Sequence, residues 1–480
     1  MMTMSGGYRC KECDLVFDTK KSYNAHMIFA HKTTSPSVKK ILVLGGGFSG
    51  LNVVQQIQKK LSKENVAITL VNEENYFLYT PMLPEVAAGM LHPSNITVPI
   101  RTVCTHSKFY QASVSDIDLE QKLVTITRTF DGKVHALEYD YLVLALGSKN
   151  NFFGNRNMEE NAFTIKSIED AISIRNHTIT MLENAAQTGD AELQKKFLTF
   201  TVVGGGFAGV ETIGELNHFV RQAAKYAYPS IDEENISLNI ISARDRILPE
   251  VGKKLGQEAM RYLKKVGVNV ITNTKATDAS EDSIALDNGE EIPCTTIIWA
   301  GGVAIDSVIT TLDCKHGRGG KISVDDYLRL HCSENVFALG DCAEILDSKG
   351  KPYPPTAQHA LRESKVVAQN LLSSIKKTGG LKKFSYHSKG MMATIGNRVG
   401  VVSIMGQNLS GISAWAIWRT YYLMNIPSLE KKVKVAADWT IDLLFKRDLT
   451  LVGKIKKKEL QQVHIGQEMP SLKEQLFADL

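Results

Sequence analysis

The sequence lacks a long apolar segment and a regular set of cysteines. No run of about 18 apolar residues occurs in its 480 residues, so we expect no helix that spans a bilayer. The opening stretch Met1–Cys10 also lacks the apolar core of a secretory signal peptide. The 7 cysteines are odd in number and scattered, which fits a reducing compartment better than a disulfide framework. The formal net charge of +5 is mild and indicates no particular class of partner.

The remaining composition is typical of a multidomain globular protein. Hydrophobic residues make up 43% of the chain and charged residues 22%. A chain of 480 residues exceeds one ordinary hydrophobic core, so we expect two or three domains. The positive charge is uneven, because residues 1–40 and 429–458 are rich in Lys and Arg while the middle is nearly balanced.

Residues 1–34 carry the ligand spacing of a zinc finger. The stretch YRCKECDLVFDTKKSYNAHMIFAHK reads Cys10-x2-Cys13-x12-His26-x4-His31. Two thiolates and two imidazoles suit a tetrahedral Zn²⁺, and so short a segment cannot bury enough apolar surface to fold without metal. The segment therefore resembles the C2H2 finger family, which predicts a small ββα finger with a structural zinc, followed by a linker at residues 35–40.

The partner of this finger is open. Sequence-specific DNA binding by such fingers uses several in tandem, and here there is one. We expect a docking or regulatory module that binds an unidentified protein or, weakly, a nucleic acid. The alternative interpretation is a basic N-terminal tail in which the four ligand-type residues are accidental.

A glycine-rich turn follows an apolar strand at residues 41–44 and precedes a helix. Three glycines have the G-x-G-x-x-G spacing of a dinucleotide-binding turn: Gly45, Gly47 and Gly50. The first permits the tight turn, the second lets a pyrophosphate approach the backbone, and the third lets helix and strand pack closely. The next strand ends near Asn72, and we expect the adjacent Glu73 to bind a ribose hydroxyl.

The same spacing occurs again about 160 residues later, in the stretch VVGGGFAGVE. The glycines of this second turn are Gly204, Gly206 and Gly209. The strand that follows ends near Ser242 instead of the usual acidic residue, and Arg244 comes soon after. A missing acid with arginine nearby can admit a 2′-phosphate, so the choice between NADH and NADPH stays open, with NADH favoured.

Two further apolar strands end in residues suited to a flavin. The strand expected in YDYLVLALGS ends at Gly147, and the strand expected in NVFALGDCAEI ends at Gly340-Asp341. The Asp341 carboxylate can accept a hydrogen bond from a ribityl or ribose hydroxyl. A helix then begins near Thr356, and its N-terminal amides favour the negative charge that collects on a reduced flavin.

In this order and spacing, these pieces resemble the two-dinucleotide-binding flavoprotein family over residues 38–375. The resemblance implies an α/β fold in which the first turn binds FAD and an inserted second Rossmann-like domain binds NAD(P)H. The implied FAD-binding domain has two segments, residues 41–160 and 301–380, on either side of the NAD(P)H-binding domain at 161–300. A C-terminal quinone and membrane region would follow at 381–480.

Three segments narrow this resemblance to the type II NADH:quinone oxidoreductases: NYFLYTPMLPEVAAGMLHPSNITVPIR, PPTAQHALRESKVVAQNL and YHSKGMMATIGNRVGVV. The family implies hydride transfer from NADH to FAD, then transfer of two electrons to a membrane quinone without proton pumping. By resemblance, the flavin, nicotinamide and quinone sites would include Ala357, Gln358, Lys389, Glu211 and Gly302. Arg362 stands where the family often has a second glutamine, which puts the quinone or its binding mode in question.

The C-terminal stretch predicts attachment to a membrane surface. Aromatic and aliphatic residues lie beside cations there, as in helices that lie in the lipid interface. The apolar members are Trp415, Trp418, Tyr421, Tyr422, Leu423 and Met424, and the cations are Lys431, Lys432, Lys434, Lys446 and Arg447. We expect peripheral attachment at the cytoplasmic face of the cell membrane, while packing on the protein's own core or in a homodimer remains the alternative.

Two other functions remain open. A sulfide:quinone oxidoreductase shares the fold but needs cysteines beside the flavin, and Cys314 or Cys342 would have to serve. A zinc-finger nucleic-acid-binding protein with a redox-sensing flavin domain would bind DNA in a salt-sensitive way. A thiol relay of the disulfide-reductase kind is not expected, because the only close cysteine pair, Cys10 and Cys13, is assigned to zinc.

Overall fold

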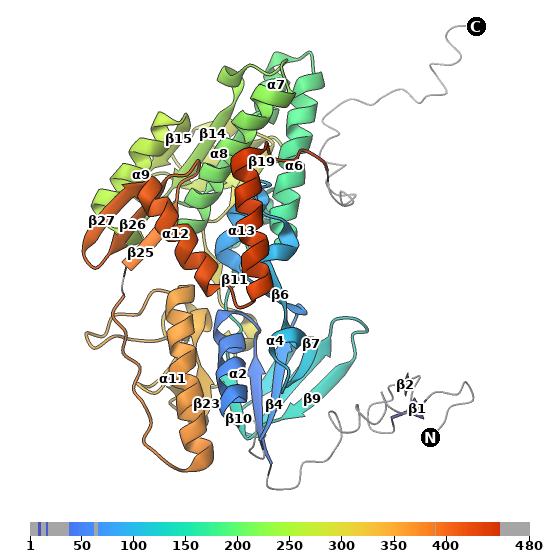
Figure 1. The fold of residues 1–480 in the computed structure, drawn as a ribbon, viewed down its shortest axis with the longest axis vertical. Coiled ribbons are helices and arrows are strands. Elements are labelled where there is room, and N and C mark those ends of the chain that lie inside the picture. The colour runs from blue at the N-terminus through green and yellow to red at the C-terminus, as the bar shows by residue number, and fades with distance from the viewer. Residues whose placement is uncertain (1–7, 11–15, 18–37, 62–65, 389, 452–480) are drawn as a thin grey trace. The chain divides into compact units, whose positions relative to one another are not determined.

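The computed structural model describes residues 8–10, 16–17, 38–61, 66–388 and 390–451 (Figure 1). These residues divide into two compact units. Unit 1 takes its described residues from the ranges 1–78, 97–150 and 303–388, and unit 2 from 79–96, 151–302 and 389–480. Each unit is therefore assembled from three separate stretches of the chain.

Unit 1 is built on an eight-stranded sheet. In spatial order its strands are β22 (Arg329–Leu330), β23 (Ser333–Ala338), β10 (Tyr141–Leu144), β3 (Lys39–Leu44), β4 (Val66–Asn72), β7 (Lys108–Asp118), β8 (Leu123–Arg128) and β9 (Val134–Glu138). The five strands from β23 to β7 are parallel, and the outer pairings are antiparallel. Central parallel strands are covered on both faces, which explains their nearly continuous apolar sequences.

Helices α2 (Phe48–Leu61) and α11 (Ala357–Lys376) pack side by side in unit 1 (Figure 1). Thr356 caps α11, because its side chain accepts a hydrogen bond from the His359 amide. The smaller elements are α4 (Ile100–Val103), α10 (Ser307–Thr310), η6 (Arg318–Gly320), η7 (Gly340–Cys342) and the strand pairs β5 (Tyr76–Leu78) with β6 (Thr97–Pro99), β11 (Lys149–Asn150) with β20 (Val303–Ala304), and β21 (Ile322–Ser323) with β24 (Ala343–Glu344).

Unit 2 contains a second parallel sheet of five strands. Their order is β12 (Phe163–Thr164), β19 (Thr296–Trp299), β13 (Thr199–Val203), β14 (Ser237–Ser242) and β15 (Val268–Thr272). Its helices are α3 (Leu83–Ala87), α5 (Arg156–Asn161), α6 (Ile168–Gln187), α7 (Ala191–Phe197), α8 (Phe207–Ala227) and α9 (Lys253–Lys265), with the turns η2 (Thr80–Met82), η3 (Pro93–Ile96), η4 (Glu233–Asn235) and η5 (Pro249–Val251).

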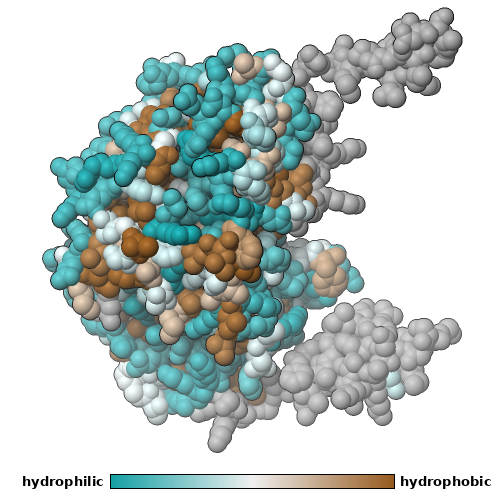
Figure 2. All heavy atoms as spheres, turned by 45° about the horizontal axis from the view of Figure 1, so that its top comes forward, coloured by the Kyte–Doolittle hydropathy of each residue, from teal (hydrophilic) through white to brown (hydrophobic). Residues whose placement is uncertain are grey.

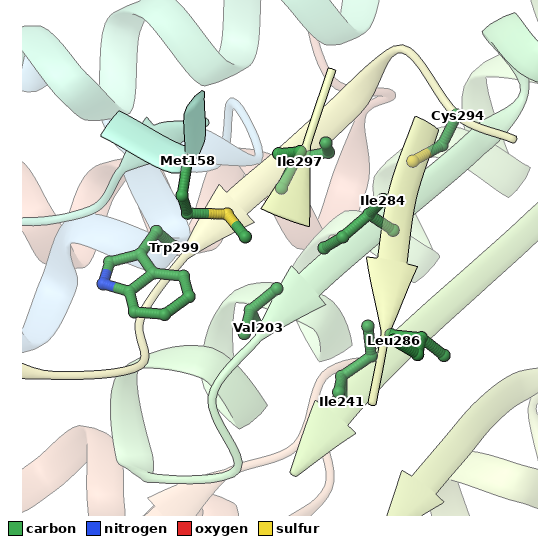
Figure 3. Packing of buried hydrophobic residues seen from close by; sticks show 9 residues of the cluster. Met158, Val203, Ile241, Ile284, Leu286, Cys294, Ile297 and Trp299 are labelled. Carbon is green, nitrogen blue, oxygen red and sulfur yellow. The ribbon is translucent and has the colours of Figure 1, made fainter. Parts of the chain in front are cut away.

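A small antiparallel sheet completes one core of unit 2. Its strands are β16 (Ala276–Ala279), β17 (Ser283–Leu286) and β18 (Glu291–Pro293). Side chains of β17 point toward those of the parallel sheet, and together they form a buried cluster (Figure 3). Ile284 on β17 and Val203 on β13 belong to it, and Trp299 lies at its edge near Met158.

The C-terminal region of unit 2 has its own three-stranded antiparallel sheet and two helices. The strands are β25 (Gly390–Thr394), β26 (Gly400–Ile404) and β27 (Gln407–Gly411), followed by α12 (Ile412–Asn425) and α13 (Leu429–Leu444). Within the described residues of the chain, every helix is too short or too polar to cross a membrane. The predicted α/β class is confirmed: each unit has a set of parallel strands with a glycine turn, and the sheet of unit 1 also has antiparallel outer strands.

Near the N-terminus, the structure describes one short pair of strands. Strands β1 (Tyr8–Arg9) and β2 (Val16–Phe17) pair in antiparallel register. Cys10 follows β1 and is buried. The other three predicted zinc ligands, Cys13, His26 and His31, lie outside the described residues, and so does Lys389. The residues that are described contain no cluster of three His, Cys, Asp or Glu side chains suited to a metal.

Candidate functional site

The first glycine turn connects β3 to α2 in unit 1. Gly45 has φ +100°, a left-handed conformation that suits glycine, and its amide donates to the Val71 carbonyl at 2.8 Å. A Cβ on Gly50 would lie 1.9 Å from the Gly45 carbonyl oxygen, so no side chain fits there. At Gly47, by contrast, a Cβ would meet no atom within 4 Å. The middle of the turn is therefore open to a ligand while both of its ends are closed by backbone.

The end of β4 presents two polar residues to this turn, and they differ in how they are used. Asn72 accepts a hydrogen bond from the Gly46 amide at 2.7 Å and donates to the Glu74 carbonyl at 2.8 Å. Both ends of the Asn72 amide are thus used to shape the turn. Glu73 follows Asn72 and is exposed.

Two more strand ends meet next to each other in unit 1. Gly147 follows β10 with φ +72°, and Gly340 follows β23 with φ +75°. The Ser148 hydroxyl donates to the Asp341 carboxylate at 2.8 Å, which links the two strand ends. The predicted pair Gly147 and Asp341 is therefore brought together at the carboxyl edge of the parallel sheet, the usual position of ligands in such folds.

The N-terminus of α11 carries the predicted flavin and quinone residues. Ala357 is its first residue, and Gln358 follows, half-buried. The Arg362 guanidinium donates to the Gln358 carbonyl at 2.7 Å and lies 4.3 Å from the centre of the Tyr386 ring. Arg362 is thus held by one contact to its own helix and one to Tyr386, and its charge lies beside the Gln358 carbonyl.

The second glycine turn, in unit 2, repeats the geometry of the first. Gly204 has φ +125°, and its amide donates to the Ile241 carbonyl at 2.8 Å. A Cβ on Gly209 would lie 1.9 Å from the Gly204 carbonyl oxygen, whereas one on Gly206 would meet nothing within 4 Å. The turn runs from β13 into α8, so its open middle also faces a helix N-terminus.

Ser242 ends β14 at the position expected to contact an adenine ribose. Its hydroxyl accepts from the Arg244 amide at 3.3 Å and donates to the Arg246 carbonyl at 3.2 Å. Arg244 is exposed, whereas Arg246 pairs with the neighbouring Asp245 at 3.1 Å. Ser242 is therefore buried, with its hydroxyl used as donor and as acceptor within its own turn, and Arg244 is unpaired among the described residues. Gly302, the predicted nicotinamide contact, follows the last strand of the NAD(P)H-binding range and lies against Phe153. A Cβ added to Gly302 would lie 2.8 Å from the Phe153 ring.

Glu211 is buried on the first turns of α8, where the structure brings it to the C-terminal region of unit 2. One of its oxygens accepts hydrogen bonds from the Trp418 indole and the Thr394 amide, both at 3.1 Å. Burial raises the pKa of Glu211 to about 8, although these two hydrogen bonds lower it to some extent. Trp418, predicted from the sequence to be one of the lipid-facing aromatics, is fully buried, and that element of the prediction is wrong.

A buried charged cluster that was not predicted from the sequence lies one helical turn further along α8. Glu215 pairs with Arg447 at 3.1 Å, and Arg447 also pairs with Asp442 at 2.8 Å. Next to them, the carboxylate of Glu85 on α3 accepts from the Trp439 indole at 3.1 Å, and burial raises the pKa of Glu85 to about 8. The i, i+4 spacing of the two α8 glutamates on an otherwise apolar face was the available signal.

Comparisons with known proteins agree with this geometry. Residues 39–364 match the family model of the pyridine nucleotide-disulphide oxidoreductases, and residues 388–448 match the NDH2 C-terminal domain. A "Probable NADH dehydrogenase" of Dictyostelium discoideum is 31% identical over 86% of this chain and 91% of that protein. A "Type II NADH:quinone oxidoreductase" of Mycobacterium tuberculosis is 30% identical over 86% of this chain and 89% of its own.

Among solved structures, NDH2 of Plasmodium falciparum in complex with NADH has the same fold. It superposes with a TM-score of 0.79 at 24% identity, covering 86% of this chain and 99% of that one. The sulfide:quinone oxidoreductase of Aquifex aeolicus also superposes, with a TM-score of 0.63 at 18% identity, covering 85% and 96%.

Proposed function

Because the chain belongs to the type II NADH:quinone oxidoreductase family, we propose that it oxidises NADH and transfers the two electrons to a quinone. The observation that carries the proposal is the pair of glycine turns with the same geometry, each at the end of a parallel strand. One turn per nucleotide is required, so two turns fit a chain that binds two dinucleotides. We assign the FAD-binding role to unit 1, which contains most of residues 41–160 and 301–380, and the NADH-binding role to the part of unit 2 that contains residues 161–300 and Gly302.

The residues of unit 1 fit FAD. The open space at Gly47 suits a pyrophosphate, Glu73 is exposed and suits a ribose, and Asp341 is held by Ser148 for a hydroxyl of the ribityl chain. When bound, FAD would supply the hydride acceptor and the electron donor to the quinone. The amide of Ala357 at the start of α11 would favour negative charge at the flavin ring.

The residues of unit 2 fit NADH. Its pyrophosphate would lie at Gly206, and the Ser242 hydroxyl would contact the adenine ribose. The backbone at Gly302 and the carboxyl group of Glu211 are our candidates for the nicotinamide end. For the quinone we propose Gln358 and Lys389, with Arg362 shaping the region around Gln358.

The direct test starts from the purified, full-length protein. We expect a yellow protein with a flavin spectrum that bleaches on anaerobic addition of NADH and recovers on addition of a soluble quinone. A colourless protein that takes up no FAD would overturn the proposal. Recovery by oxygen alone, with no acceleration by quinone, would leave a flavoprotein oxidase instead.

We expect the wild-type protein to prefer NADH over NADPH, and we expect its remaining activity with NADPH to depend on Arg244. The Arg244 side chain is exposed and unpaired among the described residues, so it can attract a 2′-phosphate but gains nothing from NADH. Arg244→Ala should therefore lower kcat/KM for NADPH by about tenfold, which is typical of a lost charge-assisted hydrogen bond, and leave the value for NADH unchanged. Arg246→Ala is the matched control, because Arg246 already pairs with Asp245. A wild-type preference for NADPH would contradict this assignment.

The C-terminal helices support peripheral attachment to a membrane. Exposed apolar residues recur at helical spacing on α13, and the surface in Figure 2 shows hydrophobic patches between hydrophilic regions. The residues on that helix are Leu429, Val433, Ile441, Leu443 and Leu444. Lys446 is exposed just beyond the end of the helix and would add attraction to anionic headgroups.

Flotation with anionic liposomes tests this attachment. The double variant Ile441→Asp with Leu444→Asp should lose most of the floating fraction, because each buried aliphatic side chain contributes about 1.5–3 kcal/mol. Phe130→Asp is the control, since Phe130 is also highly exposed but belongs to unit 1. Equal flotation of all three proteins would argue against α13 as the attachment site, and a change in oligomeric state alone would indicate a homodimer interface.

We also retain the N-terminal zinc finger as a proposal. The antiparallel pairing of Tyr8–Arg9 with Val16–Phe17 supports it, since Cys10 and Cys13 lie between these two strands in the sequence. Metal analysis of the full chain should find one zinc that Cys13→Ser removes without loss of NADH oxidation. Absence of zinc from the wild-type protein would favour the basic-tail interpretation.

The two alternative functions are less well supported. The single thiol hydrogen of Cys342 is shared between the Leu339 carbonyl at 3.4 Å and the Leu144 carbonyl at 3.5 Å. Burial raises the pKa of Cys342 to about 11, so it is a poor nucleophile for sulfide chemistry. Cys314 is only half-buried, but burial raises its pKa to about 11 as well. A single predicted finger gives little support to a nucleic-acid-binding function.

A further inference from the structure

Glu363 is a buried carboxylate of unit 1 that the proposed function has not used. It lies on α11 with 3% of its surface exposed. Within the described residues of the chain, no Lys or Arg forms an ion pair with it, although Lys321 lines the same small pocket. Burying a carboxylate without a paired cation is costly, so an apolar residue would be the cheaper choice for packing alone.

The partner of this carboxylate is a backbone amide. The Gly340 N–H donates to Glu363 Oε2 at 2.8 Å. Gly340 has φ +75°, and a Cβ at that position would lie 2.4 Å from the Ser49 hydroxyl, so a side chain is strongly disfavoured there. The next residue is Asp341, whose carboxylate accepts from Ser148. Glu363 and Ser148 therefore hold the same turn from two directions, one through its backbone and one through its side chain.

The pocket beside the turn adds a second reason to assign a role to Glu363. Gly340, Thr356, His359 and Glu363 all line it, so it lies between the strand end and the N-terminus of α11. Burial and the neighbouring Asp341 raise the pKa of Glu363 to about 7, while the Gly340 amide and Lys321 lower it to some extent. An acceptor oxygen is present in either protonation state, so the bond to Gly340 does not require the charge.

We propose that Glu363 is a positioning residue for the flavin, which acts by fixing the Gly340 peptide and thereby the direction of the Asp341 carboxylate. The proposal rests on the proposed function, because it takes Asp341 to bind FAD. In this role the hydrogen-bond acceptor of Glu363 matters and its negative charge does not. Glu363 touches neither substrate nor reacting atoms in this role.

Three substitutions separate the acceptor from the charge. Glu363→Gln keeps an acceptor oxygen at the same reach and removes the charge. Glu363→Asp keeps the charge but is one methylene shorter, so it cannot reach the Gly340 amide without movement. Glu363→Leu removes both. Ser364→Ala is the matched control, because it removes a buried hydrogen bond of α11, from the Ser364 hydroxyl to Asn52, that does not involve the turn.

Release of FAD from the full-length holoprotein on dilution is measured by the rise of flavin fluorescence. The dissociation constant is measured by titration with FAD. We expect dissociation constants within about threefold of wild type for Glu363→Gln and Ser364→Ala, and at least about tenfold higher for Glu363→Asp and Glu363→Leu. If Glu363→Leu does not fold, the order of the Gln and Asp variants still decides. Unchanged FAD binding in Asp, or a loss in Gln as large as in Asp, would overturn the inference. Wild-type protein without any FAD binding would instead overturn the proposed function.

Discussion

Alanine at Gly50 is expected to give a protein that no longer retains FAD, whereas alanine at Gly209 should give a yellow protein that NADH reduces poorly. Both added methyl groups would lie 1.9 Å from a carbonyl oxygen of the same turn, at Gly45 and Gly204 respectively. The helix must move away from the strand to relieve the contact, at a cost of about 1–3 kcal/mol or more. That cost corresponds to at least about a fivefold loss of affinity for the nucleotide at the affected turn.

The two variants test which nucleotide each turn binds. Bound flavin is measured from the visible spectrum after purification, and reduction by NADH from anaerobic stopped-flow traces. Gly380→Ala in unit 1 and Gly189→Ala in unit 2 are the controls, because a Cβ at either position would meet no atom within 4 Å. Loss of flavin in the Gly209 variant with retention in the Gly50 variant would reverse our assignment of the two turns.

Arg447→Met is expected to cause a large loss of stability in unit 2. The side chains of Arg447 and Glu215 are each only 2% exposed, and Arg447 also binds Asp442 and the Ala88 carbonyl. Removing the cation leaves the carboxylates of Glu215 and Asp442 without their partner in a buried site. Breaking a buried ion pair in this way lowers the free energy of unfolding by about 3–5 kcal/mol. Lys434→Ala in the neighbouring helix α13 is the control, since its exposed pair with Glu430 should contribute less than about 1 kcal/mol.

The loss of stability in the Arg447→Met protein should be larger at high pH than at low pH. Burial raises the pKa of Glu215 above its ordinary value of 4.5, and Arg447 is the main group that lowers it again. Without Arg447 the carboxyl group is more stable protonated in the folded protein than in the unfolded one. Stability of the Arg447→Met protein is therefore highest near or below pH 4.5 and falls as the pH rises through the raised pKa.

Thermal melting at several pH values measures both effects. The double variant Arg447→Met with Glu215→Leu should recover much of the loss, because a buried ion pair can be replaced by apolar residues at little cost. An Arg447→Met protein that melts like wild type at pH 8 would show that the cluster does not hold the C-terminal helices. A loss that is equal at pH 5 and pH 8 would show that the uncompensated Glu215 charge is not its cause.

Much of the fold follows from local sequence. The glycine spacing at both turns, the apolar strands before them and the residues at the ends of later strands predict two parallel α/β sheets. These features can be predicted from the sequence because they depend on residues only a few positions apart. Gly50, for example, must be small because it packs on Gly45 of the same turn. The hydroxyl at Ser242 and the carboxylate at Asp341 are likewise placed by the strands that immediately precede them.

Hydrogen-bond and ion-pair partners that lie far apart in the chain could not be predicted from the sequence in the same way. Trp418 has the composition of a lipid-facing aromatic, but the structure buries it because its indole donates to Glu211, 207 residues away. Neither the pairing of Glu215 with Arg447 nor the bond from the Gly340 amide to Glu363 could be predicted, since a charged residue does not indicate its distant partner.

The sequence by itself thus determined the two glycine turns, the strands that position them and the class of cofactor they suit. The physical reason is that steric fit at a turn and apolar periodicity act over a few residues. Only the tertiary structure decided which carboxylates are buried and what they bind. Burial and long-range hydrogen bonds set the pKa and the role of groups such as Glu211 and Glu363, and both arise when segments distant in the chain come together.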